Sequence, residues 1–252
     1  QMISLTIEGA VAIATLCRPP VNAINEEWVA RLDAVLDEVE RAEQVGVLWL
    51  RSSERVFCAG ADLALMQTLF DNPAGRTRMI DLTRRMQAVF ARLESLSKVT
   101  LAEIGGAAMG GGFELALACD LRLVAESARI GLPEARLGLL PAAGGTQRMT
   151  RICGEAVARR LILGAELVGG TEAVGLGLAQ WSSPSAEIEA TARALAGRIA
   201  DLPVATLAAC KHCIDVAREA GTDGYEVELA GSARLLAEPE TRRRVTHFLE
   251  KR

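Results

Sequence analysis

The chain has 252 residues, of which half are apolar and 24% are charged, and its formal net charge is −4. This composition is typical of a globular protein and gives no basis for a nucleic acid partner. Apolar runs are broken by Gly, Glu or Arg well before the ~20 residues of a membrane span, so no membrane partner is expected. Six cysteines scattered through apolar segments predict reduced thiols in a cytoplasmic protein.

Apolar periodicity predicts short strands that alternate with helices over the first part of the chain. Glu8 and Gly9 form the turn between the first two strands. The predicted strands are 3–8, 11–16, 45–50, 99–104, 121–125 and 128–131. The predicted helices are 26–42, most of 63–95 with a break at 72–75, 113–119, 154–163 and 171–174, with loop and turn at 133–145.

The pattern changes after Pro184. The rest of the chain shows no strand pattern, only helical segments at 186–200, 203–219, 223–236 and 239–250. Mixed strands and helices followed by an all-helical tail predict an α/β fold, in which residues 1–185 form the core and residues 186–252 a separate helical region.

Three segments carry residues whose chemistry needs an explanation. Residues 57–62 (FCAGAD) place small residues where a ligand can approach the backbone, although a tight strand-to-helix turn capped by Asp62 is the simpler explanation. Residues 110–120 (GGGFELALACD) start a helix with glycines, whose N–H groups suit a developing oxyanion. In residues 131–148, Glu134 follows a proline, and an exposed loop acid is the alternative there.

Glu114 is the most informative of these residues. It stands in the first turn of an otherwise apolar helix, which is therefore expected to be buried. A buried carboxylate is costly unless it is paired or functional, whereas a first-turn glutamate can also simply stabilise the helix dipole. Two acids beside a glycine-rich oxyanion site suit proton transfers around a carbonyl group.

Other chemistries fit the sequence less well. Glycines 105–112 match neither the dinucleotide-binding pattern nor the P-loop pattern. His212 and His247 lie in the predicted tail helices, without neighbours that suggest a catalytic base. Cys210 and Cys213 form a C-x-x-C around His212, but the chain offers no second ligand pair. Two thiols packed in a helix are therefore expected rather than a metal site.

Together, the three segments resemble the crotonase (enoyl-CoA hydratase/isomerase) family. That family has F-C-A-G-A-D, G-G-G-x-E-L-A-L-A-C-D, G-x-P-E and G-G-T-Q-R in this order, and the similar pattern runs from residues 18–24 to residues 248–252. The resemblance implies a crotonase-like spiral of strand–strand–helix turns over 1–185. It also implies that the helical region 186–252 serves oligomerisation, into a homotrimer or a dimer of trimers.

The resemblance further implies an enoyl-CoA hydratase, which adds water across the double bond of a 2-enoyl-CoA to give a 3-hydroxyacyl-CoA in fatty-acid or related acyl-CoA breakdown. By this resemblance, the N–H groups of Ala61 and Gly111 form the oxyanion hole. Glu114 activates the water, and Glu134, 134 − 114 = 20 residues later, supplies the proton to the α carbon. The positions implied to contact coenzyme A are Ala59, Gly60, Asp62, Leu63, Phe248 and Lys251, the last two across a subunit boundary. No metal is implied, and no cofactor other than the coenzyme A of the substrate.

The chain also departs from the family pattern. Family hydratases often carry lysines after the A-G-A-D turn and near the R-P segment, where this chain has Ala64 and Pro20. Other residues must then hold the coenzyme A phosphates, or hold them less tightly. Ala142 replaces a usual glycine, and its methyl group could shift the catalytic water.

Three alternative functions fit the sequence less well than hydration. Isomerisation of a 3-enoyl-CoA can run on the Glu134-type acid alone, so the presence of Glu114 favours hydration. A non-catalytic acyl-CoA-binding protein would be indicated by the loss of either acid, and both are present. A peptidase would need a Ser–His pair, which the motifs lack. The sequence leaves the acyl group open, although the pocket wall is expected from residues 63–90, including Met66, Leu69, Phe70, Met86 and Phe90.

Overall fold

The computed structural model describes residues 2–250 and builds the chain around a six-stranded sheet of order β1-β2-β3-β4-β6-β9. Every neighbouring pair is parallel except the β1–β2 hairpin. These strands are β1 (Ile3–Glu8), β2 (Val11–Leu16), β3 (Val47–Ser52), β4 (Val99–Ile104), β6 (Leu121–Ala125) and β9 (Trp181–Ser183). A smaller sheet joins β5 (Ala108–Met109), β7 (Arg129–Gly131) and β8 (Val168–Gly169). The predicted α/β class is confirmed.

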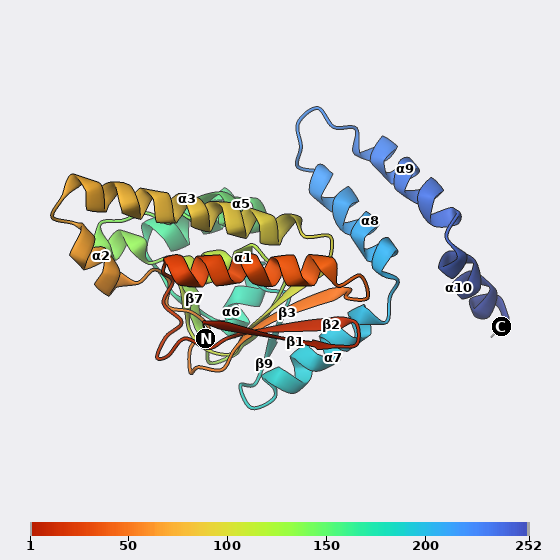
Figure 1. Ribbon diagram of the computed structural model, residues 1–252, viewed down its shortest axis with the longest axis horizontal. Coiled ribbons are helices and arrows are strands. Elements are labelled where there is room, and N and C mark those ends of the chain that lie inside the picture. Colours follow the sequence, from red (N-terminus) through yellow and green to blue (C-terminus); the bar gives the residue numbers. More distant parts are fainter. Residues whose placement is uncertain (1, 251–252) are drawn as a thin grey trace.

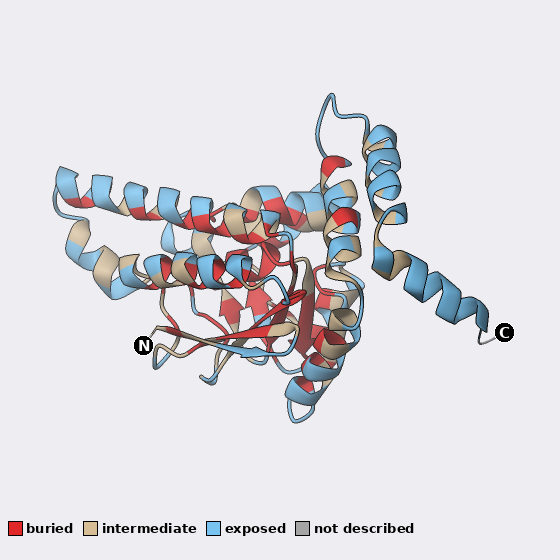
Figure 2. Ribbon diagram, turned by 45° about the vertical axis from the view of Figure 1, so that its right-hand side comes forward, coloured by how far each residue is buried: buried red, intermediate tan, exposed pale blue. Residues whose placement is uncertain are grey.

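Helices cover both faces of the main sheet. Figure 1 shows α1 (Glu26–Arg41) and α3 (Pro73–Ser95) on one side and α7 (Ile188–Ala200) on the other. Asn25 caps α1 by accepting a hydrogen bond from the N–H of Trp28. The apolar positions that predicted this helix are all buried, and they are Trp28, Leu32, Val35, Leu36 and Val39. The core therefore fills the spaces between the sheet and these helices, as the buried residues in Figure 2 show.

Shorter helices lie where the sequence placed its chemistry. They are α2 (Leu63–Leu69), α4 (Gly111–Leu117), the 3-10 helix η1 (Glu134–Leu137), α5 (Gly145–Leu163) and α6 (Gly170–Gly175). The predicted helix start at Gly154 was wrong, because α5 begins nine residues earlier, at Gly145. Gly154 interrupts α5 with a non-helical backbone (φ 80°, ψ 163°), so the predicted start coincides with a kink inside the helix.

The tail is helical throughout its described part, as predicted. After α7 come α8 (Val204–Val216), α9 (Gly224–Leu236) and α10 (Pro239–Glu250). In Figures 1 and 2, α9 and α10 project from the body, and neither contains a buried residue. α8 is tied to the core by Lys211, whose Nζ lies 2.8 Å from Oδ2 of Asp120. Because α7 packs on the sheet, the predicted division at residue 185 cuts between packed elements, and it stays a prediction.

None of the six cysteines forms a disulfide. Cys58 and Cys119 are buried, which raises the pKa of each thiol to about 12. Cys210 and Cys213 both lie in α8 as expected, although Cys210 is exposed. Within residues 2–250, no cluster of three His, Cys, Asp or Glu side chains could hold a metal ion. In the same part of the chain, no helix has the length and apolar character needed to cross a membrane.

Candidate active site

Two backbone N–H groups come together where the strand-to-helix turn meets the start of α4. Ile24 donates its N–H to the Gly60 carbonyl (2.8 Å) and accepts from Asp62 (3.0 Å), so the N–H of Ala61 between them is left out of this ladder. Gly111 is the first residue of α4, where an N–H has no partner within the helix. No backbone hydrogen bond among the described residues uses either group.

The turn at Gly60 depends on this residue being glycine. Its φ of 95° lies in the left-handed region, and a Cβ there would stand 2.8 Å from the Met109 carbonyl oxygen and 3.1 Å from the nitrogen of Gly111. The two N–H groups are therefore held by backbone segments in direct contact. Asp62 caps α2 by accepting from Leu65, and its ion pair with Arg18 (2.8 Å) also keeps its pKa low. The simpler explanation of Asp62 as a helix cap is thus confirmed.

Glu114 is buried, with 2% of its surface exposed. Its Oε1 accepts hydrogen bonds from the N–H groups of Ala143 (2.9 Å) and Gly145 (2.7 Å), at the start of α5. Burial raises the pKa of Glu114 to about 7, Gly145 opposes this rise, and the charge of Glu134 adds to it. A buried glutamate with a fixed oxygen and a near-neutral pKa suits proton transfer.

Glu134 opens η1 and lies against the start of α4. A Cβ on Gly110 would stand 2.8 Å from Oε1 of Glu134, so the two residues are in close contact. Oε2 of Glu134 is buried without a hydrogen-bond partner. Burial raises the pKa of this carboxyl group. An orphaned buried oxygen is unusual and often marks a functional position, so Glu134 is not an exposed loop acid.

One cavity of about 770 Å³ contains all these groups. Both acids, Ala61 and Gly111 line it, together with the four predicted neighbours Ala59, Gly60, Asp62 and Leu63. Its apolar wall comes from α2 and α3, mainly through Met66, Leu69, Met79, Leu82 and Met86. Phe70 and Phe90, which were also expected in this wall, do not line the cavity: Phe90 is buried in the core, and Phe70 is 47% exposed.

Comparison with known proteins agrees with this arrangement. Residues 6–252 match the family model described as enoyl-CoA hydratase/isomerase. The chain belongs to the enoyl-CoA hydratase/isomerase family. A Bacillus subtilis protein named "Probable enoyl-CoA hydratase" is 36% identical to this chain, and the match covers 99% of this chain and 96% of that protein. The short-chain-enoyl-CoA hydratase of Clostridium acetobutylicum is 32% identical, and the match covers 99% of this chain and 95% of that protein. A solved structure of Pseudomonas aeruginosa DspI, which is 33% identical in sequence, superposes with a TM-score of 0.92 and covers 100% of this chain and 95% of its own chain.

Family membership accounts for the shared motifs, and the structure adds residues that sequence reasoning missed. The donors to Glu114 are Ala143 and Gly145, and neither is the substituted Ala142. The Ala142 carbonyl instead accepts a hydrogen bond from Gln87 of α3 (2.6 Å). The G-G-T-Q-R motif pointed to this loop, but it did not reveal which backbone groups would reach Glu114.

The last two predicted positions lie at the far end of the chain. Phe248 belongs to α10, is 61% exposed and does not line the cavity. Lys251 lies outside the described residues. Both were expected to act on a neighbouring subunit, so their contact with coenzyme A stays a prediction.

A further buried acid lies away from the cavity. Glu103 of β4 is 4% exposed and accepts a hydrogen bond from Nε1 of Trp49 (3.0 Å), while Nε of Arg51 lies 3.8 Å from the same Oε2. Burial raises its pKa to about 7, against the effect of Arg51. Because Glu103 is not part of the cavity lining, its raised pKa bears on stability rather than on the site.

Proposed function

We propose that this member of the family is an enoyl-CoA hydratase, which adds water to a 2-enoyl-CoA to give a 3-hydroxyacyl-CoA. One observation carries the proposal: two buried acids with raised pKa values share an apolar cavity with two backbone N–H groups that make no backbone hydrogen bond within residues 2–250. The relatives named as hydratases, similar over nearly their whole length, support the same reaction.

The N–H groups of Ala61 and Gly111 receive the thioester carbonyl oxygen. When water attacks the β carbon, the electron pair of the double bond moves toward this oxygen, which becomes an enolate oxygen. Fixed donors in an enclosed site favour that charge by about 3–4 kcal/mol each. Because both donors are backbone groups on contacting segments, they need no reorganisation during the reaction.

The two acids carry the protons. Glu114 acts as the base: it accepts one proton of the water while the water oxygen bonds to the β carbon. Glu134 starts protonated and gives its proton to the α carbon as the enolate collapses. One proton must then pass from Glu114 to Glu134, directly or through solvent, to reset the site. Burial raises the pKa of both carboxyl groups, and the charge of Glu134 raises that of Glu114 further, so the protonation of one acid depends on that of the other.

The cavity walls suggest how the rest of the substrate lies. The apolar residues of α2 and α3 suit an acyl chain, and residues 59–63 at the turn suit the pantetheine and adenine of coenzyme A. Phe248 and Lys251 remain proposed contacts to coenzyme A on a neighbouring subunit. No cofactor or metal enters this mechanism, since coenzyme A is part of the substrate.

The exposed tail supports a proposed homotrimer or dimer of trimers. Large apolar side chains of α8, α9 and α10 are more than half exposed, and they are Ile214, Tyr225, Leu229, Leu236, Val245, Phe248 and Leu249. Apolar surface of this kind is typical of an assembly interface. Cysteines that form no disulfides are consistent with the proposed cytoplasmic location.

The activity test uses 2-enoyl- and 3-enoyl-CoA esters of increasing chain length, followed by the absorbance of the conjugated thioester. Glu114→Gln and Glu134→Gln should each lower kcat for the 2-enoyl esters by ~100-fold or more, the effect of a lost general base or acid. Binding of a saturated acyl-CoA should change little, because no proton moves. Full hydratase activity in Glu114→Gln would contradict the mechanism. Retained 3-enoyl isomerisation without hydration would assign the enzyme as an isomerase instead.

A further inference from the structure

The loop that supplies the two donors to Glu114 is itself held by side chains from two helices. Gln87 of α3 binds the carbonyl of Ala142, and Arg148 of α5 donates from Nη1 to the carbonyl of Ala143 (3.1 Å). The N–H of Ala143 is one of the two groups that bind Glu114. The carbonyl of Ala143 belongs to the peptide group between residues 143 and 144, so Arg148 fixes the backbone between the two donors, Ala143 and Gly145.

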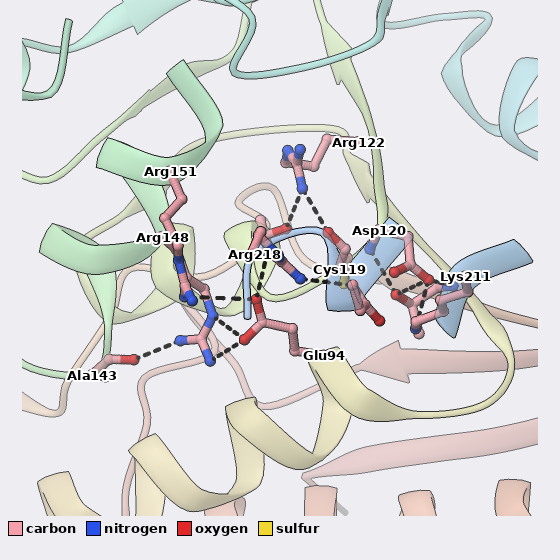
Figure 3. A network of polar contacts seen from close by, with 12 residues as sticks. Glu94, Cys119, Asp120, Arg122, Ala143, Arg148, Arg151, Lys211 and Arg218 are labelled. Atoms are coloured by element: carbon pink, nitrogen blue, oxygen red, sulfur yellow. Dashed lines mark hydrogen bonds and ion pairs between the residues drawn. The ribbon is translucent and has the colours of Figure 1, made fainter. Parts of the chain in front are cut away.

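Arg148 is fixed on its other side by Glu94, as Figure 3 shows. Its Nε and Nη2 donate to Oε2 of Glu94 at 3.0 and 2.9 Å. Arg148 is only 5% exposed, and a guanidinium in that position needs such partners. The other oxygen of Glu94 lies 3.6 Å from Arg218, just beyond α8, and 3.7 Å from Arg151. The guanidinium is thus clamped between an acid and the loop.

The two glycines before α5 leave room for this arrangement. Gly144 has a φ of 102°, and a Cβ there would lie 2.2 Å from Nη1 of Arg148. A Cβ on Gly145 would lie 2.7 Å from Oε1 of Glu114. One glycine therefore admits the arginine and the next admits the catalytic carboxylate. The loop is shaped around both side chains at once.

We propose that Arg148 is a positioning residue for Glu114: it holds the Ala143 carbonyl so that the N–H groups of Ala143 and Gly145 stay aimed at the carboxylate. The inference rests on the proposed function, with Glu114 as the base. Arg148 does not line the cavity, so it acts on the reaction only through Glu114. Its guanidinium also lowers the pKa of Glu114 by its charge.

The pH dependence of kcat separates positioning from simple structural support. The charged groups that act on Glu114 are Glu134 of η1 and Arg148 of α5. If ionised Glu114 is the base, activity falls as the pH drops through its pKa. Arg148→Met removes the nearby cation and one anchor of the loop. The acidic limb of the profile should then move to higher pH and kcat should fall by ~10- to 100-fold, the scale of a misplaced catalytic group. KM should change by less than ~3-fold, because Arg148 does not contact the cavity.

Three further variants complete the experiment, with 2-butenoyl-CoA as the substrate. Arg148→Lys keeps the positive charge but loses the forked guanidinium that binds Glu94 and Ala143 together. The acidic limb of the pH profile should therefore stay near its wild-type position, while kcat falls ~10-fold. Glu94→Gln weakens the contact that holds Arg148 and removes a negative charge. We therefore expect kcat to fall while the acidic limb of the pH profile does not move to higher pH. Arg151→Met is the matched control, since Arg151 reaches Glu94 and makes no bond to the loop, and it should match wild type in both respects.

The outcomes are distinct. Wild-type kcat and an unshifted limb in Arg148→Met would overturn the inference, and so would a loss of activity that only follows the unfolded fraction, measured by circular dichroism, with the limb unmoved. If Arg148→Met does not fold, Arg148→Lys decides: a wild-type kcat in that variant overturns the inference. An inactive wild-type enzyme, or an active Glu114→Gln, would instead reject the proposed function and this inference with it.

Discussion

Gly145→Ala tests the site with a single methyl group. Gly145 starts α5, and its φ lies outside the left-handed region, so alanine suits the backbone. Space is the problem. A Cβ would lie 2.7 Å from Oε1 and 2.9 Å from Cγ of Glu114, and 2.9 Å from Cδ1 of Leu132. The substitution therefore pushes directly on the carboxylate and leaves its chemistry intact.

The size of the displacement follows from these distances. Ordinary contact begins near 3.4 Å, so Oε1 must retreat by 3.4 − 2.7 = 0.7 Å. The bond from Gly145, now 2.7 Å, would then exceed the range of a good hydrogen bond. A bond to a charged group contributes about 1.5–3 kcal/mol, and a displacement near 1 Å costs about 100-fold in rate. Because the N–H of Gly145 lowers the pKa of Glu114, losing it should also raise that pKa above about 7.

Initial rates of 2-butenoyl-CoA hydration across neutral pH measure both effects. We expect kcat to fall by about 100-fold and the acidic limb to move to higher pH. Gly197→Ala in α7 is the matched control, because nothing lies within 4 Å of its Cβ position. Alanine inside a helix is favoured over glycine by about 0.5–1 kcal/mol, so this control should keep its activity and its stability. Full activity of Gly145→Ala, with an unshifted limb, would refute the assignment of Glu114 as the base.

Three further predictions concern other parts of the molecule. Gly111→Val should keep the fold, since the nearest atom to its Cβ is the flexible Cε of Met86 at 3.0 Å, and should lose ~100-fold in kcat; an active variant would place the carbonyl elsewhere. The pKa of Glu103 is raised from 4.5 to about 7, so ionisation destabilises the fold as the pH rises through that window. Between acidic and mildly alkaline pH, the free energy of unfolding of Glu103→Gln, measured in urea, should rise relative to that of wild type by up to about 3 kcal/mol. A difference that stays constant with pH would contradict this. Truncation of residues 239–252 should weaken both assembly and acyl-CoA binding, measured by light scattering and calorimetry; a truncated protein normal in both would reject the proposed role of the tail.

The sequence predicted the bounds of strands well where turn residues mark the ends of an apolar run. The bounds of β1, β2, β4 and β6 agree with prediction, because turn residues and apolar runs delimit them. β8 and β9 have two and three residues, too few for any periodicity to register. The first half of α5 was not predicted as helix, because glycines stand at its start, at 144 and 145, and interrupt it at 154.

The site was predictable in part, and for a different reason. The family motifs named both glutamates and both N–H donors, and one cavity contains all four. The resemblance could not tell which face of α3 would meet the cavity, so Phe90 was expected in the wall and is buried in the core instead. The role of Arg148 depends on contacts with Glu94 and Ala143, which are 54 and 5 residues away along the chain. Spacing in a single sequence does not reveal such contacts.

Side-chain mutagenesis would not detect the two N–H groups of Ala61 and Gly111. Both donors belong to the main chain, so replacing a side chain leaves them in place. Residue 61 is already alanine, and the Cβ of an alanine at residue 111 would lie 3.0 Å from the end of the flexible Met86 side chain, 3.4 Å from Ile24 and 3.5 Å from Cα of Gly60. An alanine scan of the cavity would report the two glutamates and pass over the groups proposed to hold the thioester oxygen. Exchanging a backbone amide for an ester at either position would detect them.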